Sequence, residues 1–193
     1  MSHIVALAGS TAEESKSTDL LKRLLGYVEE HGISTKLISV RDIPPNELIY
    51  GAPKNSPHLK EVTEHIERAT GIIVATPIYK ASYSGALKAF LDLLPEKSLV
   101  GKVVLPIATA GSSKHLLAID YALKPVLSSL GATQILSGFF VSDNQLQRDK
   151  NGHLLLDNES ELRFEEQVRT LLQSIRFIKP VSQKEYAPAE YFN

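Results

Sequence analysis

Five short apolar runs alternate with amphipathic stretches along the chain, and this alternation restricts the possible fold more than any other feature. The runs are His3–Ala8, Thr35–Val40, Gly71–Thr76, Lys102–Ala108 and Thr133–Val141. The first, third and fourth are almost continuously apolar, which is typical of strands that are covered on both faces. Strands that alternate with helices predict a doubly wound α/β domain with a five-stranded parallel sheet.

The stretches between the runs show helical periodicity. Leu20, Leu24 and Val28 lie on the apolar stripe of a first helix. Ser17 or Thr18 can cap its start, and a glycine that can end it stands at position 32. Four more helices are expected over Leu59–Ala69, Leu87–Leu94, Leu116–Leu130 and Leu162–Ile175.

Three segments show no such periodicity. Arg41–Pro57 is rich in proline and is expected to form an ordered loop. Ser142–Asn158 contains Lys150-Asn151-Gly152, a turn signal that can join a small hairpin. Phe177–Asn193 has the composition of a tail. The 193 residues suit one domain, expected over 1–178, followed by a tail over 179–193.

Composition argues against several classes of function. The formal net charge is −1 and no basic run is present, which argues against nucleic acid and an anionic membrane surface as partners. No apolar stretch approaches the roughly 20 residues that span a bilayer. The chain has no cysteine, so disulfides and thiolate chemistry are excluded. No secretory signal is visible, so a cytoplasmic protein is expected. Metal sites built on cysteine are excluded for the same reason as disulfides.

The segments that follow the first, third and fourth runs carry the chemistry. In an open α/β sheet, ligands bind beyond the carboxyl ends of the strands, near the switch in strand order. The first such segment, Gly9–Thr18, is rich in hydroxyls and leads into a helix, where the dipole favours an anion such as a phosphate. It matches neither the Walker A spacing nor the GxGxxG fingerprint. Ordinary helix capping by Ser15, Ser17 or Thr18 is the alternative.

The second and third loops suit a flat aromatic ligand. Pro77 makes the end of the third run rigid, and Tyr79 offers an amphipathic ring to such a ligand. The third loop, Ala108–His115, is built from small residues that let the backbone approach a ring closely. The order 2-1-3-4-5 and a Rossmann-like order both fit the periodicity, and the loop chemistry favours the first.

These loops belong to longer motifs with a familiar pattern. The motifs are LAGST, SKSTDLL, IIVATPIYKASYSGALKAFLDLLPE, GKVVLPIATAGSSKHLLAIDYALKPVLSSLGA and FFVSD. Together they resemble the NADPH-dependent FMN reductase family, and above all the flavin reductases of two-component alkanesulfonate monooxygenase systems. The resemblance covers about Ile4 to Asp143. It implies a flavodoxin-like three-layer sandwich, a homodimer or homotetramer, and no metal.

The resemblance also implies roles for individual residues. The FMN phosphate would lie at the first loop, the ring and ribityl chain at the second, and the isoalloxazine along the third. In that order, the residues concerned are Ser10, Ser15, Ser17 and Thr18; Pro77, Ile78 and Tyr79; and Thr109, Ala110, Gly111 and Ser112. The family often has proline and arginine where this chain has Thr11 and Ala12. Many relatives have Pro-Gly where it has Ser84-Gly85.

The implied reaction is hydride transfer from NADPH, or NADH, to FMN. The cofactor carries that chemistry, so no protein nucleophile is expected and no catalytic side chain is assigned. Reduced FMN would pass to a partner monooxygenase.

The fourth predicted helix is apolar on more than one face, which suggests burial against both the sheet and another subunit. Pro125 lies inside it and lacks an N–H, so a kink or a π-bulge is expected. By resemblance, reductases that release flavin have such a disruption near a tyrosine like Tyr121. We therefore expect Tyr121 and Pro125 to mark a subunit interface that loosens flavin binding, with a simple proline kink as the alternative.

Two other functions fit the same fold. A quinone, azo-dye or chromate reductase would keep FMN bound and reduce a second small acceptor. A flavodoxin-type electron carrier would hold FMN without oxidising NAD(P)H, but such carriers are usually strongly acidic and this chain is nearly neutral.

Overall fold

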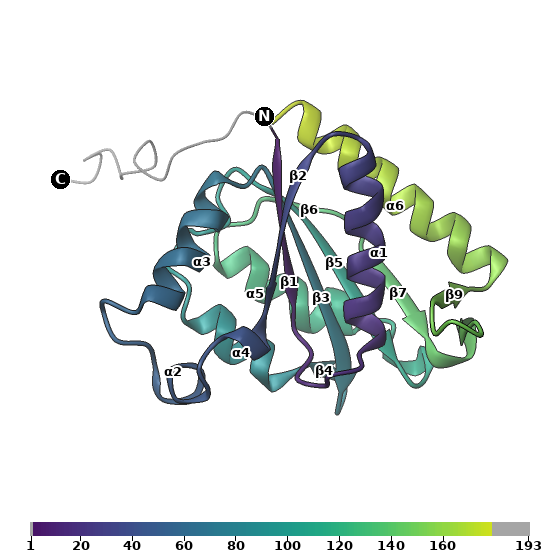
Figure 1. Ribbon diagram of the computed structural model, residues 1–193, viewed down its shortest axis with the longest axis horizontal. Coiled ribbons are helices and arrows are strands. Elements are labelled where there is room, and N and C mark those ends of the chain that lie inside the picture. Colours follow the sequence, from purple (N-terminus) through teal and green to yellow (C-terminus); the bar gives the residue numbers. More distant parts are fainter. Residues whose placement is uncertain (1, 179–193) are drawn as a thin grey trace.

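The computed structural model describes residues 2–178 and has three layers (Figure 1). A central sheet separates two groups of helices. One face carries α1 (Lys16–Glu30) and α6 (Asn158–Arg176). The other carries α3 (Pro57–Arg68), α4 (Gly85–Asp92) and α5 (Lys124–Ser129). The predicted three-layer α/β sandwich is therefore confirmed. The tail expected over 179–193 lies outside the described residues.

The parallel strands follow the predicted order. Along the sheet lie β2 (Ser34–Ser39), β1 (His3–Ala8), β3 (Gly71–Tyr79), β5 (Val103–Ala110) and β6 (Gln134–Ile135), with β7 (Phe139–Ser142) also pairing with β5. The first four positions give the order 2-1-3-4 of the prediction, and β6 with β7 fills the fifth.

The sheet has seven strands rather than the five predicted. The predicted strand Thr133–Val141 is split into β6 and β7, because the backbone leaves the sheet between them. Gly138 adopts a φ of +94° there. A Cβ at this glycine would lie 2.9 Å from the Pro106 side chain, so the chain passes too close to β5 for a larger residue. The other addition is β4 (Ser82–Tyr83), which pairs antiparallel with the end of β3.

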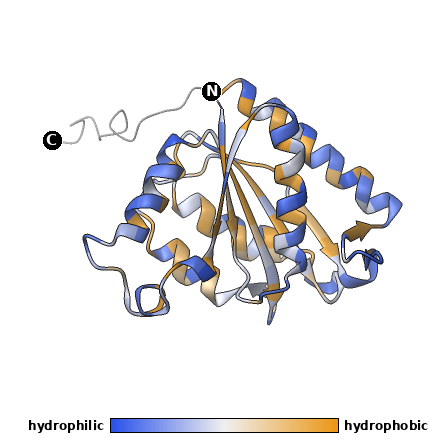
Figure 2. Cartoon of the chain, viewed as in Figure 1, coloured by the Kyte–Doolittle hydropathy of each residue, from blue (hydrophilic) through white to orange (hydrophobic). Residues whose placement is uncertain are grey.

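The continuous apolar character of β3 is explained by its two covered faces. Ile73 and Ala75 point into the core formed with α1 and α6. Ile72 and Val74 point into the core formed with α3, α4 and α5. All four side chains are fully buried, and burial of each larger one stabilises the fold by ~1.5–3 kcal/mol. Figure 2 shows the same division, with apolar residues in the sheet and hydrophilic ones on the outer faces of the helices.

The first helix begins at the earliest of the three capping candidates. Ser15 is the N-cap of α1, since its hydroxyl accepts a hydrogen bond from the Thr18 N–H at 3.3 Å, and Ser17 and Thr18 lie within the helix. The predicted end is confirmed: α1 stops at Glu30, and Gly32 follows with a φ of +73°.

The proline-rich segment is more regular than the predicted loop. It contains a short 3-10 turn, η1 (Val40–Asp42), and the helix α2 (Pro45–Tyr50). A proline at the first helical position costs nothing, because that position needs no N–H donor. The buried Glu47 of α2 accepts a hydrogen bond from the Ser56 hydroxyl at 2.6 Å, which ties α2 to the start of α3.

The fourth predicted helix is disrupted, as expected. A 3-10 turn, η2 (Ser113–His115), precedes a π-helical segment, η3 (Ile119–Leu123), which continues into α5. The Lys124 N–H donates to the Ile119 carbonyl, five residues back, as in a π-helix. Pro125 lies in the first turn of α5, directly after this segment.

The predicted hairpin after the sheet is also confirmed. It joins β8 (Leu146–Arg148) to β9 (Leu154–Leu156) after a third 3-10 turn, η4 (Asp143–Gln145). Gly152 adopts a φ of +82° in the connecting turn. None of the helices within residues 2–178 combines the length and apolarity that a bilayer span needs.

Candidate active site

The loops that follow β1, β3 and β5 meet at one pocket. Its volume is about 270 Å³ and it opens to solvent at the carboxyl ends of these strands. Eight of the eleven residues predicted to bind the cofactor line it: Ser10, Ser15, Pro77, Ile78, Tyr79, Thr109, Ala110 and Gly111. Ala12, Glu14, Lys16 and Asp143 complete the lining. Ser17, Thr18 and Ser112 are outside it.

The first loop holds its hydroxyls by short internal contacts. Ser10 is buried, and its hydroxyl accepts a hydrogen bond from the Ala12 N–H at 3.2 Å. The Ser15 and Ser17 hydroxyls lie 3.0 Å apart, so Ser17 reaches the pocket only through Ser15. Because α1 begins directly after Ser15, the N-terminus of this helix faces the pocket, and it favours an anionic group there.

A buried network joins the first loop to the second. The Ser84 hydroxyl donates to the Gly9 carbonyl, and the Ser84 N–H donates to the Thr76 hydroxyl at 3.1 Å. Gly9 also packs against Leu87 of α4, and a Cβ at this glycine would lie 2.9 Å from the Leu87 side chain. Sequence reasoning missed this network. The sequence feature that could have indicated it is Gly9, a residue without a side chain directly after the first apolar run.

The second loop contains a short hairpin. β3 continues through Pro77, which pairs with Thr109 of β5, and then turns into β4. Tyr79 stands at the rim of the pocket with about half of its surface exposed (51%). The two turn residues, Lys80 and Ala81, have φ values of +51° and +66°. Non-glycine residues rarely adopt such a conformation, which stores strain beside Tyr79.

The third loop presents backbone to open space. Thr109 and Ala110 end β5 and are nearly fully buried. A Cβ placed on Gly111 would meet nothing within 4 Å, so a ligand can approach this backbone closely. The Ser112 hydroxyl instead accepts from the Lys114 N–H at 3.3 Å and caps η2, which explains why it does not line the pocket.

The π-helical segment packs against the floor of the pocket. Its buried residue Ile119 belongs to a small apolar cluster with Ile78 and Ala110, which line the pocket. Away from the pocket, Tyr121 of the segment is 79% exposed, and Leu117, which lies just before the segment, is 58% exposed. The segment therefore connects an exposed apolar surface to the residues predicted to contact the flavin ring.

The charges around the pocket were not predicted. Lys16 and Asp143 form an ion pair, with Lys16 Nζ 2.9 Å from Asp143 Oδ1. Asp143 follows β7 directly, so its position at the end of a strand was the available signal. Outside the lining, Arg41 reaches the first loop and donates to the Thr11 carbonyl at 2.6 Å.

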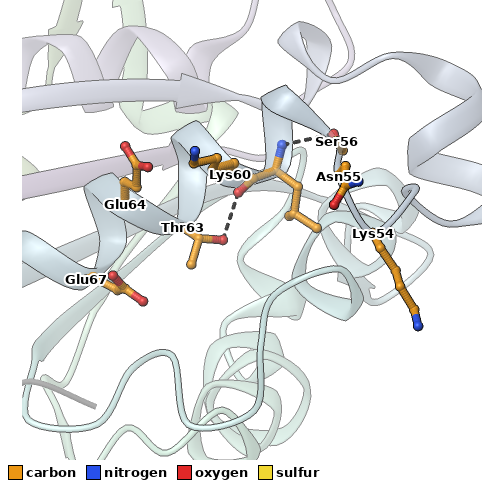
Figure 3. Close-up of a pocket in the computed structure, with 8 residues that line it drawn as sticks. Lys54, Asn55, Ser56, Lys60, Thr63, Glu64 and Glu67 are labelled. Carbon is orange, nitrogen blue, oxygen red and sulfur yellow. Dashed lines mark hydrogen bonds between the residues drawn. The ribbon is translucent and has the colours of Figure 1, made fainter. Parts of the chain in front are cut away.

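A larger hollow, of about 570 Å³, lies elsewhere (Figure 3). It runs along the outer face of α3 and is lined by polar side chains such as Lys60 and Glu64. Two of its hydroxyls serve the helix itself: the Ser56 hydroxyl caps the Leu59 N–H, and the Thr63 hydroxyl donates to the Leu59 carbonyl. It contains none of the predicted site residues and no residue of the loops that follow β1, β3 and β5.

Within residues 2–178, no group of three or more His, Asp or Glu side chains could hold a metal ion.

The parallel sheet in the order 2-1-3-4-5, with helices on both faces and a pocket at the carboxyl ends, defines a flavodoxin-like α/β protein. A profile of the NADPH-dependent FMN reductase family matches residues 2–147. The chain therefore belongs to the NADPH-dependent FMN reductase family, a family of oxidoreductases.

Named relatives agree with this assignment. The chain is 50% identical over 147 residues to an FMN reductase (NADPH) of Escherichia coli, covering 74% of each protein. It is 48% identical over 143 residues to an FMN reductase (NADPH) of Pseudomonas putida, covering 74% of this chain and 72% of the relative. Among solved structures, the apo form of the NADH:FMN oxidoreductase EMOB is similar, with a TM-score of 0.81, 36% identity and 90% coverage of both chains.

Proposed function

We propose that this chain is a flavin reductase that oxidises NADPH, reduces FMN as an exchangeable substrate, and supplies the product to a partner flavin-dependent monooxygenase. The observation that carries the proposal is the open pocket that joins a hydroxyl-lined helix start to a loop of small residues. The names of the two bacterial relatives support the reaction. The resemblance of the sequence motifs to the reductases of alkanesulfonate systems supports the partner.

The pocket fits the chemistry of FMN. Hydroxyls of Ser10 and Ser15 stand at the start of α1, where a phosphate would gain both hydrogen bonds and the helix dipole. The open backbone at Gly111 suits the edge of a planar ring. Pro77 and Tyr79 supply the apolar border that such a ring needs. In this arrangement Ser17 and Thr18 support the phosphate loop from within α1.

When bound, FMN supplies the electron-accepting ring that takes hydride from the nicotinamide. The protein's tasks are binding, orientation and exclusion of competing reactions. The N–H groups of the third loop, at Ala110 and Gly111, are our candidates for donors to the polar edge of the ring. Tyr79, half exposed at the rim, is positioned to limit how a nicotinamide enters above the ring. No protein nucleophile is required.

The position of the π-helical segment supports the proposal that FMN is released after reduction. Ile119 packs on the pocket floor, whereas Tyr121 and Leu117 are exposed on the outer side. A homodimer or homotetramer that covers this outer surface would couple assembly to the shape of the flavin site. The segment, with Pro125 directly after it, then acts as a device that keeps FMN exchangeable.

The test is NADPH oxidation by flavin-stripped protein, with and without added free FMN, and with NADH in parallel. We expect oxidation that saturates with FMN and protein that elutes nearly colourless from gel filtration afterwards. Strong yellow retention with little turnover of free FMN would favour a quinone, azo-dye or chromate reductase. Absence of oxidation with any flavin and either nucleotide would overturn the enzyme and favour an electron carrier.

A further inference from the structure

The charges that line the flavin pocket are arranged unusually for a site that receives a phosphate. The charged side chains of its described lining are Glu14, Lys16 and Asp143. Two are acidic and one is basic, so the lining carries a formal charge of −1 at neutral pH. An FMN phosphate adds about −1.5 to −2. The hydroxyls and the dipole of α1 therefore attract the phosphate, whereas the net negative charge of the lining side chains weakly repels it.

The single lysine of this lining is already paired. Lys16 is the first residue of α1, and its Nζ lies 2.9 Å from the Asp143 carboxylate, which follows β7. Both side chains remain partly exposed (39% and 47%), so the pair is accessible to a ligand and is open to competition. An incoming phosphate must share Lys16 with Asp143 or displace it.

Fold stability does not explain this pair. A second ion pair already joins α1 to the segment after β7, since Arg148 Nη2 of β8 lies 2.6 Å from Asp19 Oδ2. That pair does not line the pocket. Partly exposed pairs contribute only ~0–1 kcal/mol to stability, so a second one adds little to the fold. The distinguishing property of the Lys16–Asp143 pair is its place in the pocket.

We propose that Asp143 competes with the phosphate of FMN for Lys16 and so weakens the binding of phosphorylated flavin. The inference rests on the proposed function, because it assigns FMN to this pocket. Asp143 thereby helps to set the affinity for FMN. This role is separate from the backbone and hydroxyl contacts that recognise the ligand. The effect is specific to the phosphate, since riboflavin presents the same ring without a charge that Lys16 could bind.

The experiment compares FMN and riboflavin binding to flavin-stripped protein by quenching of flavin fluorescence. In Asp143→Asn, Lys16 is free and the shape of the side chain is kept, so we expect the Kd for FMN to fall by roughly three- to tenfold. The Kd for riboflavin stays unchanged. The matched control is Asp92→Asn, which breaks an exposed lysine pair on α4 (Lys88 Nζ to Asp92 Oδ1, 2.7 Å) outside the pocket. It removes the same charge and leaves both Kd values unchanged.

A second variant tests whether Asp143 acts through the lysine. Lys16→Met weakens FMN binding but not riboflavin binding, and in this background Asp143→Asn tightens FMN less than in the wild type. An unchanged or raised Kd for FMN in Asp143→Asn overturns the inference, as does an equal change for riboflavin. Wild-type protein that binds neither flavin contradicts the proposed function instead. Thermal melting of each variant verifies that it is folded.

Discussion

The hydroxyl of Ser84, at the start of α4, donates a hydrogen bond to the backbone carbonyl of Gly9, at the end of β1. The same hydroxyl accepts from the Leu87 N–H at 3.1 Å and so caps α4. One buried side chain therefore fixes the start of a helix and the start of the first loop. By the family resemblance, many relatives have proline at this position, and a proline side chain could make neither of these hydrogen bonds.

Ser84→Ala removes both contacts and leaves the Gly9 carbonyl without its side-chain donor. We expect the free energy of unfolding to fall by about 1–3 kcal/mol, measured by urea denaturation. Because the first loop is then less fixed, the KM for FMN should rise as well. Ser129→Ala is the control, since the Ser129 hydroxyl donates to a backbone carbonyl at an exposed helix end. A loss no larger than in Ser129→Ala would contradict the assigned role.

Gly9 is a second position where the first loop depends on close packing. A Cβ there would lie 2.9 Å from Leu87 Cδ2 and 3.0 Å from the Ala75 carbonyl, and the carbonyl cannot move without disturbing β3. We expect Gly9→Ala to destabilise the protein by ~1–3 kcal/mol and to weaken flavin binding.

Gly26→Ala is the matched control, because Gly26 lies inside α1 and its Cβ would meet nothing within 4 Å. That variant should be more stable by about 0.5–1 kcal/mol, since alanine favours a helix. Similar effects of the two substitutions in thermal and urea unfolding would refute the argument from packing.

The parts of the fold that were predictable are those in which one residue pattern has one structural solution. The continuous apolar run of β3 requires two covered faces, and the helices on both sides of the sheet provide them. The break before β7 was not predictable, because it depends on the contact between Gly138 and Pro106. The helix α2 was missed because its prolines suggested a loop, although Pro45 occupies a position where proline is favourable.

The turn Lys80-Ala81 stores strain that a substitution should release. Both residues have positive φ, where alanine and lysine are unfavourable and glycine or asparagine is tolerated. We expect Ala81→Gly to raise the free energy of unfolding by about 1 kcal/mol, measured by urea denaturation. Ala86→Gly, inside α4, serves as the control and should destabilise by about 1 kcal/mol or more, because there glycine weakens a helix and removes a methyl group that packs against the core. Destabilisation by Ala81→Gly would show that the turn is not strained.

The buried amine of Lys102 predicts a pH effect on stability. It is 4% exposed and donates to the carbonyls of Ala69 at 2.9 Å and Glu67 at 3.2 Å, at the end of α3. Burial lowers the pKa of Lys102 from its ordinary value of 10.5 to about 8. Between these two pH values the unfolded chain binds more protons than the folded protein, so stability rises with pH in this window.

The measurement is urea unfolding of the wild type and of Lys102→Met between pH 7 and pH 10. As the pH rises across the window, the free energy of unfolding of the wild type should increase relative to that of Lys102→Met by on the order of 2 kcal/mol. Each pKa unit corresponds to ~1.4 kcal/mol. A difference that stays constant with pH would show that the two carbonyls hold the amine in its charged form.

Sequence reasoning could group residues that the structure brings to one pocket, because strand ends in a parallel sheet meet at one edge. It could not separate Ser15 from Ser17 and Thr18, since that depends on which residue begins α1. It also missed the pair of Lys16 and Asp143, because contacts between distant segments leave no local pattern. The roles of all these residues in binding stay predictions that the flavin titrations test.

Tyr121 provides the remaining prediction, on the link between assembly and flavin release. Its side chain is 79% exposed on the π-helical segment, whose inner residue Ile119 packs beneath the pocket. If another subunit covers this surface, Tyr121→Ala should give smaller species in sedimentation velocity and slower release of FMN, because the segment loses the contact that holds it in the π form. Tyr50→Ala is the control, since Tyr50 is an even more exposed tyrosine (87%) on α2, outside this segment. Unchanged assembly together with unchanged FMN release would leave the disruption as a simple consequence of Pro125, which cannot donate an N–H to a regular helix.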